Sequence, residues 1–180
     1  YFTSGGSEAD NQAIISAARF GARKGKKHII TTAFEHHAVL HTVQKLEKEG
    51  YDVTYLDVRQ GHNITAQQVK DAIREDTCLV TCMYANNEIG SVLPIAEIGA
   101  VCKEKGVFFI CDCAQSAGVI PIDMVKMNIS CLCFTGHKSL LGPQGTGGFI
   151  ITPEFEQHVS PLIAGGTGSV SDSLEMPHSM

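Results

Sequence analysis

The chain has 180 residues, of which 43% are hydrophobic, and a formal net charge of -5 at pH 7. This length and composition predict one domain with one sizeable core, and the negative charge argues against a surface that binds nucleic acid. No apolar run reaches the length of a transmembrane helix, and Tyr1 does not begin a signal peptide, so we expect a cytoplasmic protein without membrane contact.

The cysteines indicate core packing. Six of the seven lie in apolar segments, where alternate residues of a strand share one face: Cys78, Cys82, Cys111, Cys113, Cys131 and Cys133. We expect buried, reduced thiols there. Structural zinc sites use Cys-x-x-Cys or histidine pairs at loop spacing, which these segments lack, so the sequence predicts no metal site.

Small residues follow the first predicted strand, which ends near Thr3. Ser4-Gly5-Gly6-Ser7-Glu8 leads into a helical pattern that ends near residues 21–25. Exposed N–H groups at such a strand-to-helix turn favour a phosphate, and we expect Ser7 to be the N-cap. A generic turn between strand and helix has a similar composition, so this motif alone does not establish a phosphate site.

Strands are predicted at 28–32, 52–57 and 77–83, and helices at 34–49 and 65–74. His36 follows the first of these strands, where an imidazole either lies flat on an aromatic cofactor ring or has a structural role.

We expect His37 and His41 to face solvent or to cap the helix. Asn86 and Asn87 follow the strand at 77–83, and their amides fit either turn chemistry or ligand binding.

A carboxylate follows the next apolar strand. The helix from Pro94 to Lys105 precedes a strand at 107–111, which ends at Asp112. A carboxylate at the end of a buried strand is costly unless a cation or a hydrogen-bond donor meets it. Asp112 therefore either caps the following turn or pairs with a cation such as a pyridinium nitrogen.

One lysine follows the strand predicted at 129–134, in Thr135-Gly136-His137-Lys138. The Gly/Pro-rich link to the last strand at 147–152 is too short for a crossover helix, so we expect that strand to be antiparallel. A lysine fixed in a desolvated pocket can lose its proton near neutral pH and form a Schiff base, whereas a surface lysine stays solvated. A short helix after Pro153 and a flexible loop at 164–171 complete the prediction.

The alternation of elements predicts a three-layer α/β/α fold around a mainly parallel seven-stranded sheet whose last strand is antiparallel. Strand ends meet at one edge of such a sheet, where ligands bind. The candidates that would meet there are Ser7, His36, Asn87, Asp112, Gln115 and Lys138. A Schiff-base lysine, a carboxylate for a ring nitrogen and helix-start N–H groups for a phosphate together predict pyridoxal 5'-phosphate as the cofactor.

Five segments carry a family resemblance: Thr3-Ser4-Gly5-Gly6-Ser7-Glu8, Glu35-His36-His37-Ala38-Val39-Leu40, Asn86-Asn87-Glu88-Ile89-Gly90, Asp112-Cys113-Ala114-Gln115-Ser116 and Gly136-His137-Lys138. In this order and spacing, the chain from Thr3 to about Ile151 resembles the cysteine desulfurase and selenocysteine lyase family. That family belongs to the class V aminotransferase-like enzymes of fold type I, which use pyridoxal 5'-phosphate.

The resemblance implies roles around the cofactor ring. Lys138 would hold the cofactor as a Schiff base, and after exchange with a substrate amine it would move the alpha proton, while Asp112 would pair with the ring nitrogen. His36 would stack on the ring as the second catalytic residue. Gln115 and Asn87 would bind near the ring hydroxyl.

The resemblance also implies a phosphate site made by Gly6, Ser7, Thr135 and His137. Many family members have Ala-Thr in place of Gly6-Ser7 and Ser in place of Thr135, and these changes preserve a backbone N–H or a hydroxyl. The loop at 165–169 differs from the family's Gly-Gly-Gly-Gln pattern, so its contribution to the partner subunit's phosphate site is not assigned.

The implied activity removes sulfur from L-cysteine, or selenium from L-selenocysteine, and leaves L-alanine. A sulfur-acceptor protein, a homodimer and a role in iron–sulfur cluster assembly follow from the same resemblance. Another class V enzyme such as an aminotransferase, or a non-catalytic scaffold, is the alternative.

The family places its persulfide-forming cysteine and its substrate-binding arginine in a C-terminal portion that this chain lacks. We therefore expect residues 1–180 to be a cofactor-binding large domain, truncated at both ends, without the small domain and inactive alone.

Overall fold

The computed structural model describes residues 1–58 and 63–163, and the predicted loop at 164–171 lies outside them. The strands described are β1 (Phe2–Thr3), β2 (His28–Thr32), β3 (Asp52–Leu56), β4 (Thr77–Met83), β5 (Phe108–Asp112), β6 (Cys131–Thr135) and β7 (Gly147–Ile151). They form one 7-stranded sheet in the order β1-β7-β6-β5-β4-β2-β3. Strands β2 to β6 pair in parallel, and β7 is antiparallel to both β6 and β1. The predicted sheet is confirmed.

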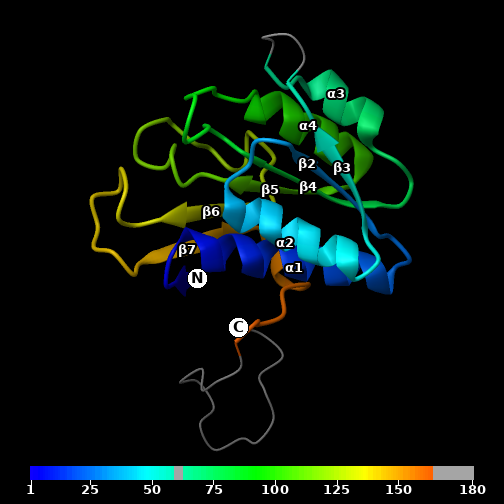
Figure 1. Cartoon of the computed structure of the whole chain (residues 1–180), viewed down its shortest axis with the longest axis horizontal. Helices are drawn as coiled ribbons and strands as arrows, with labels where there is room; N and C mark the ends of the chain where they lie inside the picture. The colour runs from blue at the N-terminus through cyan, green and yellow to red at the C-terminus, as the bar shows by residue number, and fades with distance from the viewer. Residues whose placement is uncertain (59–62, 164–180) are drawn as a thin grey trace, which may run out of the picture.

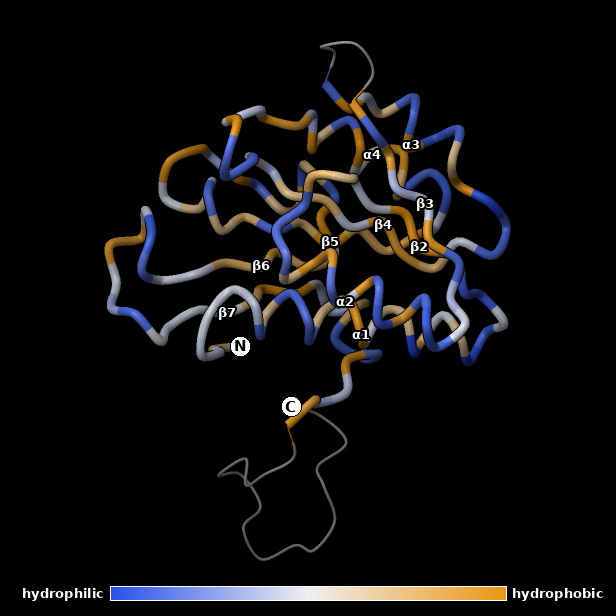
Figure 2. The backbone as a smooth tube through the Cα atoms, in the orientation of Figure 1, coloured by the Kyte–Doolittle hydropathy of each residue, from blue (hydrophilic) through white to orange (hydrophobic). Residues whose placement is uncertain are grey.

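Helices cover both faces of the sheet, which makes the three predicted layers (Figure 1). The helices are α1 (Gly6–Arg23), α2 (His37–Lys48), α3 (Ala66–Ala72), α4 (Ile95–Lys105) and α5 (Pro153–Glu156). One core cluster joins α1, α2 and α5 to the sheet, and the other joins α3 and α4 to its opposite face. The central strands are accordingly hydrophobic, whereas the outer turns of the helices are largely hydrophilic (Figure 2).

Most predicted boundaries differ from the structure by one to three residues, and three of the differences concern residues at the carboxyl ends of the strands or at the start of α1. Asp112 and Thr135 are the last residues of β5 and β6 rather than the first residues beyond them. The N-cap of α1 is Gly5, not Ser7 as predicted, and it makes no side-chain cap hydrogen bond. Glu8 closes this turn instead, because its carboxylate accepts the backbone N–H of Ser4 at 2.7 Å.

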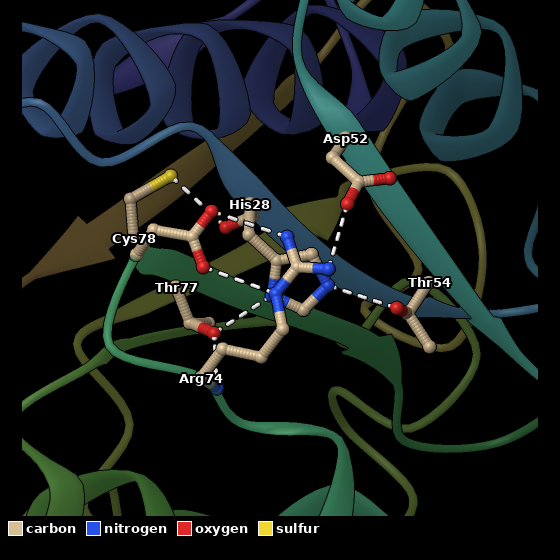
Figure 3. A network of polar contacts seen from close by, with 7 residues as sticks. His28, Asp52, Thr54, Arg74, Thr77 and Cys78 are labelled. Carbon is tan, nitrogen blue, oxygen red and sulfur yellow. Dashed lines mark hydrogen bonds and ion pairs between the residues drawn. The ribbon is translucent and has the colours of Figure 1, made fainter.

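A buried histidine joins the amino ends of β2, β3 and β4 (Figure 3). His28 is fully buried, with Nδ1 2.7 Å from the Thr77 hydroxyl and Nε2 2.8 Å from the Thr54 hydroxyl. A neutral imidazole satisfies both threonines, since one ring nitrogen donates and the other accepts. Arg74 closes the network by an ion pair of 2.7 Å to Asp52.

All seven cysteines are buried and unpaired, as predicted. Burial raises the pKa of Cys78 and of Cys102 to about 12, so both are thiols at neutral pH. Among the residues described, no helix is both long enough and apolar enough to span a bilayer.

Candidate active site

A cavity opens at the carboxyl ends of β4, β5 and β6, beside the start of α1. The empty space between its walls, which includes open solvent, is about 550 Å³. The lining residues are Gly6, Ser7, Asp10, His36, Met83, Asn87, Asp112, Ala114, Gln115, Thr135, His137 and Lys138. Every residue that the sequence predicts for cofactor binding is among them, although these residues come from separate segments of the chain.

The start of α1 supplies unblocked backbone donors to this cavity. Because Gly5 makes no side-chain cap hydrogen bond, no capping side chain occupies the first N–H groups of the helix. Gly147 on β7 lies so close that a Cβ there would come within 2.6 Å of the Gly5 Cα. Across the cavity, the Thr135 hydroxyl and His137 Nδ1 are 2.9 Å apart. Helix N–H groups, a hydroxyl and an imidazole together suit a phosphate.

His36 is held by the helix that it begins. It is the N-cap of α2, and its Nδ1 accepts the backbone N–H of Ala38 at 3.1 Å. The ring proton is therefore on Nε2 when the imidazole is neutral. His37 and His41 do not cap α2: they are exposed, as the alternative prediction had it, and their rings stack with centroids 4.9 Å apart.

The structure separates the two asparagines that the sequence left equivalent. Asn86 is buried and makes turn contacts, since its Oδ1 accepts the N–H groups of Glu88 and Ile89, each at 2.9 Å. Its amide nitrogen donates to the Phe34 carbonyl at 2.9 Å. Asn87 is exposed and lines the cavity. Asn86 thus serves the turn, and of the pair it is Asn87 that lines the cavity.

Asp112 is 5% exposed at the end of β5. Its Oδ1 accepts the backbone N–H of Ala114 at 2.8 Å, so the predicted cap of the following turn is present, and the residue lines the cavity as well. Burial raises the pKa of Asp112, and the Ala114 N–H and the charges of His36 and Lys138 oppose that rise. The carboxyl group is therefore suited to a cationic ligand.

Lys138 is half-buried in the turn after β6 and lines the same cavity. The turn is closed by hydrogen bonds from Leu141 N–H to the Lys138 carbonyl and from Gly142 N–H to the Gly136 carbonyl, at 2.9 Å and 2.8 Å. Within the described part of the chain, no carboxylate forms an ion pair with Lys138. Its amine is thus available to a ligand.

Sequence reasoning missed three lining residues, namely Asp10, Met83 and Ala114. Met83 and Ala114 carry no chemical signal in the sequence. Asp10 does carry one, because it shares the apolar stripe of α1 with Ala13 and Ala17, at i, i+3 and i+7. An acid on the stripe that packs against the sheet is an exception to the pattern and indicates a special role.

Similarity to known proteins identifies the family of this chain. The model of the Aminotransferase class-V family matches residues 1–176. The chain belongs to this family. A Bacillus subtilis relative that bears a cysteine desulfurase name, IscS 1, is 52% identical over 166 residues, which cover 92% of this chain and 42% of the relative. The cysteine desulfurase IscS of Clostridium botulinum is 49% identical, and the match covers 92% of this chain and 41% of the relative.

A solved structure of SspA in complex with cysteine superposes with a TM-score of 0.86 and 43% identity, covering 92% of this chain and 47% of SspA. The predicted resemblance to cysteine desulfurases is confirmed by these similarities. The chain spans less than half the length of the curated relatives that it matches.

Proposed function

We propose that this class-V protein is a pyridoxal 5'-phosphate-dependent cysteine desulfurase and that the present chain is its cofactor-binding large domain. The observation that carries the proposal is that Asp112, Lys138 and the uncapped start of α1 line one cavity. An anion site, an acid and an amine are what the phosphate, ring nitrogen and aldehyde of this cofactor require.

The residues present fit the cofactor. Lys138 would attach it covalently, Asp112 would face the ring nitrogen, and His36 would stack on the ring in the orientation set by its Ala38 contact. Asn87 and Gln115 would bind near the ring hydroxyl.

The phosphate would lie at Gly6 and Ser7 on α1, opposite Thr135 and His137. In addition, a buried oxygen of Asp10 without a hydrogen-bond partner lies in the cavity wall, which is a polar position that awaits a ligand or a proton.

When bound, pyridoxal 5'-phosphate supplies a sink for the electrons that develop at the alpha carbon of an amino acid. The chain's own part is proton handling. With the cofactor in place, the Asp112 carboxylate would favour a protonated ring nitrogen, and Lys138 Nζ would take the alpha proton and return it. Because Nδ1 of His36 accepts the Ala38 N–H, its Nε2–H would remain available as a hydrogen-bond donor.

The substrate that we propose is L-cysteine, with L-alanine as product and a sulfur-acceptor protein as the next carrier; L-selenocysteine is the alternative substrate. We also propose a homodimer, as expected from the family. The relatives' desulfurase names and the cysteine bound to SspA favour cysteine over the amine donors of aminotransferases.

Visible absorption tests the cofactor assignment. The full-length protein titrated with pyridoxal 5'-phosphate should develop the band of a covalently attached cofactor. Lys138→Ala should abolish this band, whereas the matched surface variant Lys126→Ala should keep it. An unchanged band in Lys138→Ala would remove this lysine from the proposed role.

A product assay tests the substrate class. Incubation of the full-length protein with L-cysteine and a thiol reductant should yield alanine and sulfide in equal amounts. Formation of a keto acid from an amine donor, without sulfide, would instead identify an aminotransferase.

A further inference from the structure

Asp10 is a buried acid in the wall of the cavity. It lies in the second turn of α1 and is 2% exposed, and its buried Oδ1 has no hydrogen-bond partner among the residues that the structure describes. Because a carboxylate oxygen removed from water and left unpaired is costly, such a group is either protonated or reserved for a ligand.

The sheet brings Asp10 and Asp112 into one space. Asp112 on β5 is the register partner of Cys133 on β6, so the two side chains leave the sheet on the same face. Cys133 belongs to the core cluster beneath α1, the helix that carries Asp10, and it lowers the pKa of Asp10. Asp10 and Asp112 therefore lie on the same side of the sheet, and both line the cavity.

The surroundings decide which acid carries the charge. Asp112 accepts the Ala114 N–H and has His36 and Lys138 nearby, all of which favour its ionised form. The groups that influence the charge of Asp10 are Asp112, Cys133, Glu35 and Cys113, and among the residues described none of these is a cation. Burial, followed by the Asp112 charge, raises the pKa of Asp10 well above its ordinary value.

We propose that Asp10 is a positioning residue for the cofactor ring: it holds a proton while the cavity is empty and releases it when the protonated ring nitrogen binds at Asp112. In the release the Asp10 O–H bond breaks, its electron pair stays on the carboxylate, and the proton leaves to solvent. Two carboxylates then face one cation, which retains the ring proton more firmly than Asp112 alone. This inference rests on the proposed cofactor.

Proton counting tests this inference. Binding of pyridoxal 5'-phosphate to the full-length apoprotein is measured by calorimetry at pH 7 in buffers with different heats of ionisation. The wild type should release about one more proton per site than Asp10→Asn, because the amide has no proton to give in this range. Glu35→Gln is the matched control: Glu35 is also a buried acid, but it does not line this cavity, so its variant should match the wild type.

Infrared difference spectra of the wild type give an independent measurement that needs no folded variant. Cofactor binding should remove the carbonyl band of a protonated carboxylic acid, and Asp10→Asn should lack this change while Glu35→Gln keeps it. Equal proton release by the wild type and Asp10→Asn, or a wild-type difference spectrum in which no acid band is lost, would overturn the role of Asp10 while the cofactor assignment stands. If the wild type develops no visible cofactor band, the proposed function fails and this inference with it.

Discussion

Polar side chains are buried both at the amino ends of the parallel strands (the amino edge) and at their carboxyl ends (the carboxyl edge), but their hydrogen bonding differs. At the amino ends of the strands, the buried His28 has a threonine at each ring nitrogen, and the exposed Arg74 beside it pairs with Asp52 (Figure 3). At the carboxyl edge, Asp10 leaves a buried oxygen without a partner in the cavity wall.

The difference separates structural from functional polarity. A buried group whose donors and acceptors are all satisfied needs nothing more and stabilises the fold. A buried acid that remains incompletely satisfied beside a cavity costs stability, and a ligand that satisfies it recovers that cost. Replacements at the two edges should therefore act in opposite ways.

The largest effect is expected from Asp112→Asn. The amide cannot hold the ring nitrogen protonated, so kcat of the full-length enzyme should fall by about 100-fold or more, comparable to the loss of one proton-transfer group. Folding of the apoprotein should be preserved, because the amide oxygen still accepts the Ala114 N–H. Steady-state kinetics beside the exposed control Asp71→Asn would check this, and activity near the wild-type level would contradict the pairing.

At the amino edge, His28→Ala should instead cost stability. The change removes the partner of the buried Thr77 hydroxyl and of the half-buried Thr54 hydroxyl and opens a cavity, so urea unfolding should report a loss of about 2–4 kcal/mol. The cofactor band should be unaffected, because His28 lies at the other edge of the sheet. A loss below about 0.5 kcal/mol would mean that the network is not structural.

The same histidine predicts a pH dependence. Burial, with help from the Arg74 charge, lowers the pKa of His28 below its ordinary value of 6.5. The unfolded chain then binds more protons than the native state below about pH 6.5, so the contribution of His28 to stability is present above this pH and is lost on acidification. The stability difference between the wild type and His28→Ala should shrink as the pH falls from 7 to 5, and a constant difference would argue against a buried neutral imidazole.

Glu35, at the carboxyl edge, predicts a contribution to stability that changes with pH in the opposite direction. It accepts a hydrogen bond from the Thr32 hydroxyl, and burial raises its pKa from 4.5 to about 8. The native state binds the extra proton between these values, so the contribution of this carboxyl to stability is full below pH 4.5 and declines up to pH 8.

Relative to the wild type, Glu35→Gln should therefore gain stability between pH 5 and 8. We expect about 1–3 kcal/mol, since each pKa unit is worth about 1.4 kcal/mol and the amide loses part of the Thr32 contact. Urea unfolding at several pH values would measure it. A difference that does not change with pH would show that Glu35 is ionised in the native state.

The last contrast concerns substitutions of two glycines beside the proposed phosphate site. A Cβ on Gly147 would come within 2.6 Å of the Gly5 backbone, whereas a Cβ on Gly6 would meet Thr135 Cβ at an ordinary 3.4 Å. We expect Gly147→Ala to cost about 1–3 kcal/mol and to weaken cofactor binding, and Gly6→Ala to be neutral or to stabilise by less than about 1 kcal/mol. Thermal melts and cofactor titrations of both variants would check this contrast, which equal effects would contradict.

Much of this site could be predicted from the sequence, because its residues follow strand ends. The apolar runs before Asp112 and Lys138 fix where each parallel strand stops, and parallel strands stop at the same edge. The predicted ends of these two strands fall one residue short, because Asp112 and Thr135 continue the hydrogen-bonded ladder although they are polar.

What the sequence could not supply is pairing between distant side chains. Asn86 rather than Asn87 reaches the Phe34 carbonyl, and that contact spans 52 residues of chain. The burial of Asp10 likewise depends on the face of α1 that packs against β6. The N-cap of α1 was predicted wrongly because Glu8 closes the turn from within the helix, a role that the neighbouring Ser7 obscured.

A crystal structure of the full-length protein with pyridoxal 5'-phosphate tests the central claim most directly. We predict continuous density from Lys138 Nζ to the cofactor and a ring nitrogen about 2.7–3.2 Å from an Asp112 oxygen. A cofactor bound elsewhere, or a ring whose nitrogen faces away from Asp112, would contradict this account of the carboxyl edge.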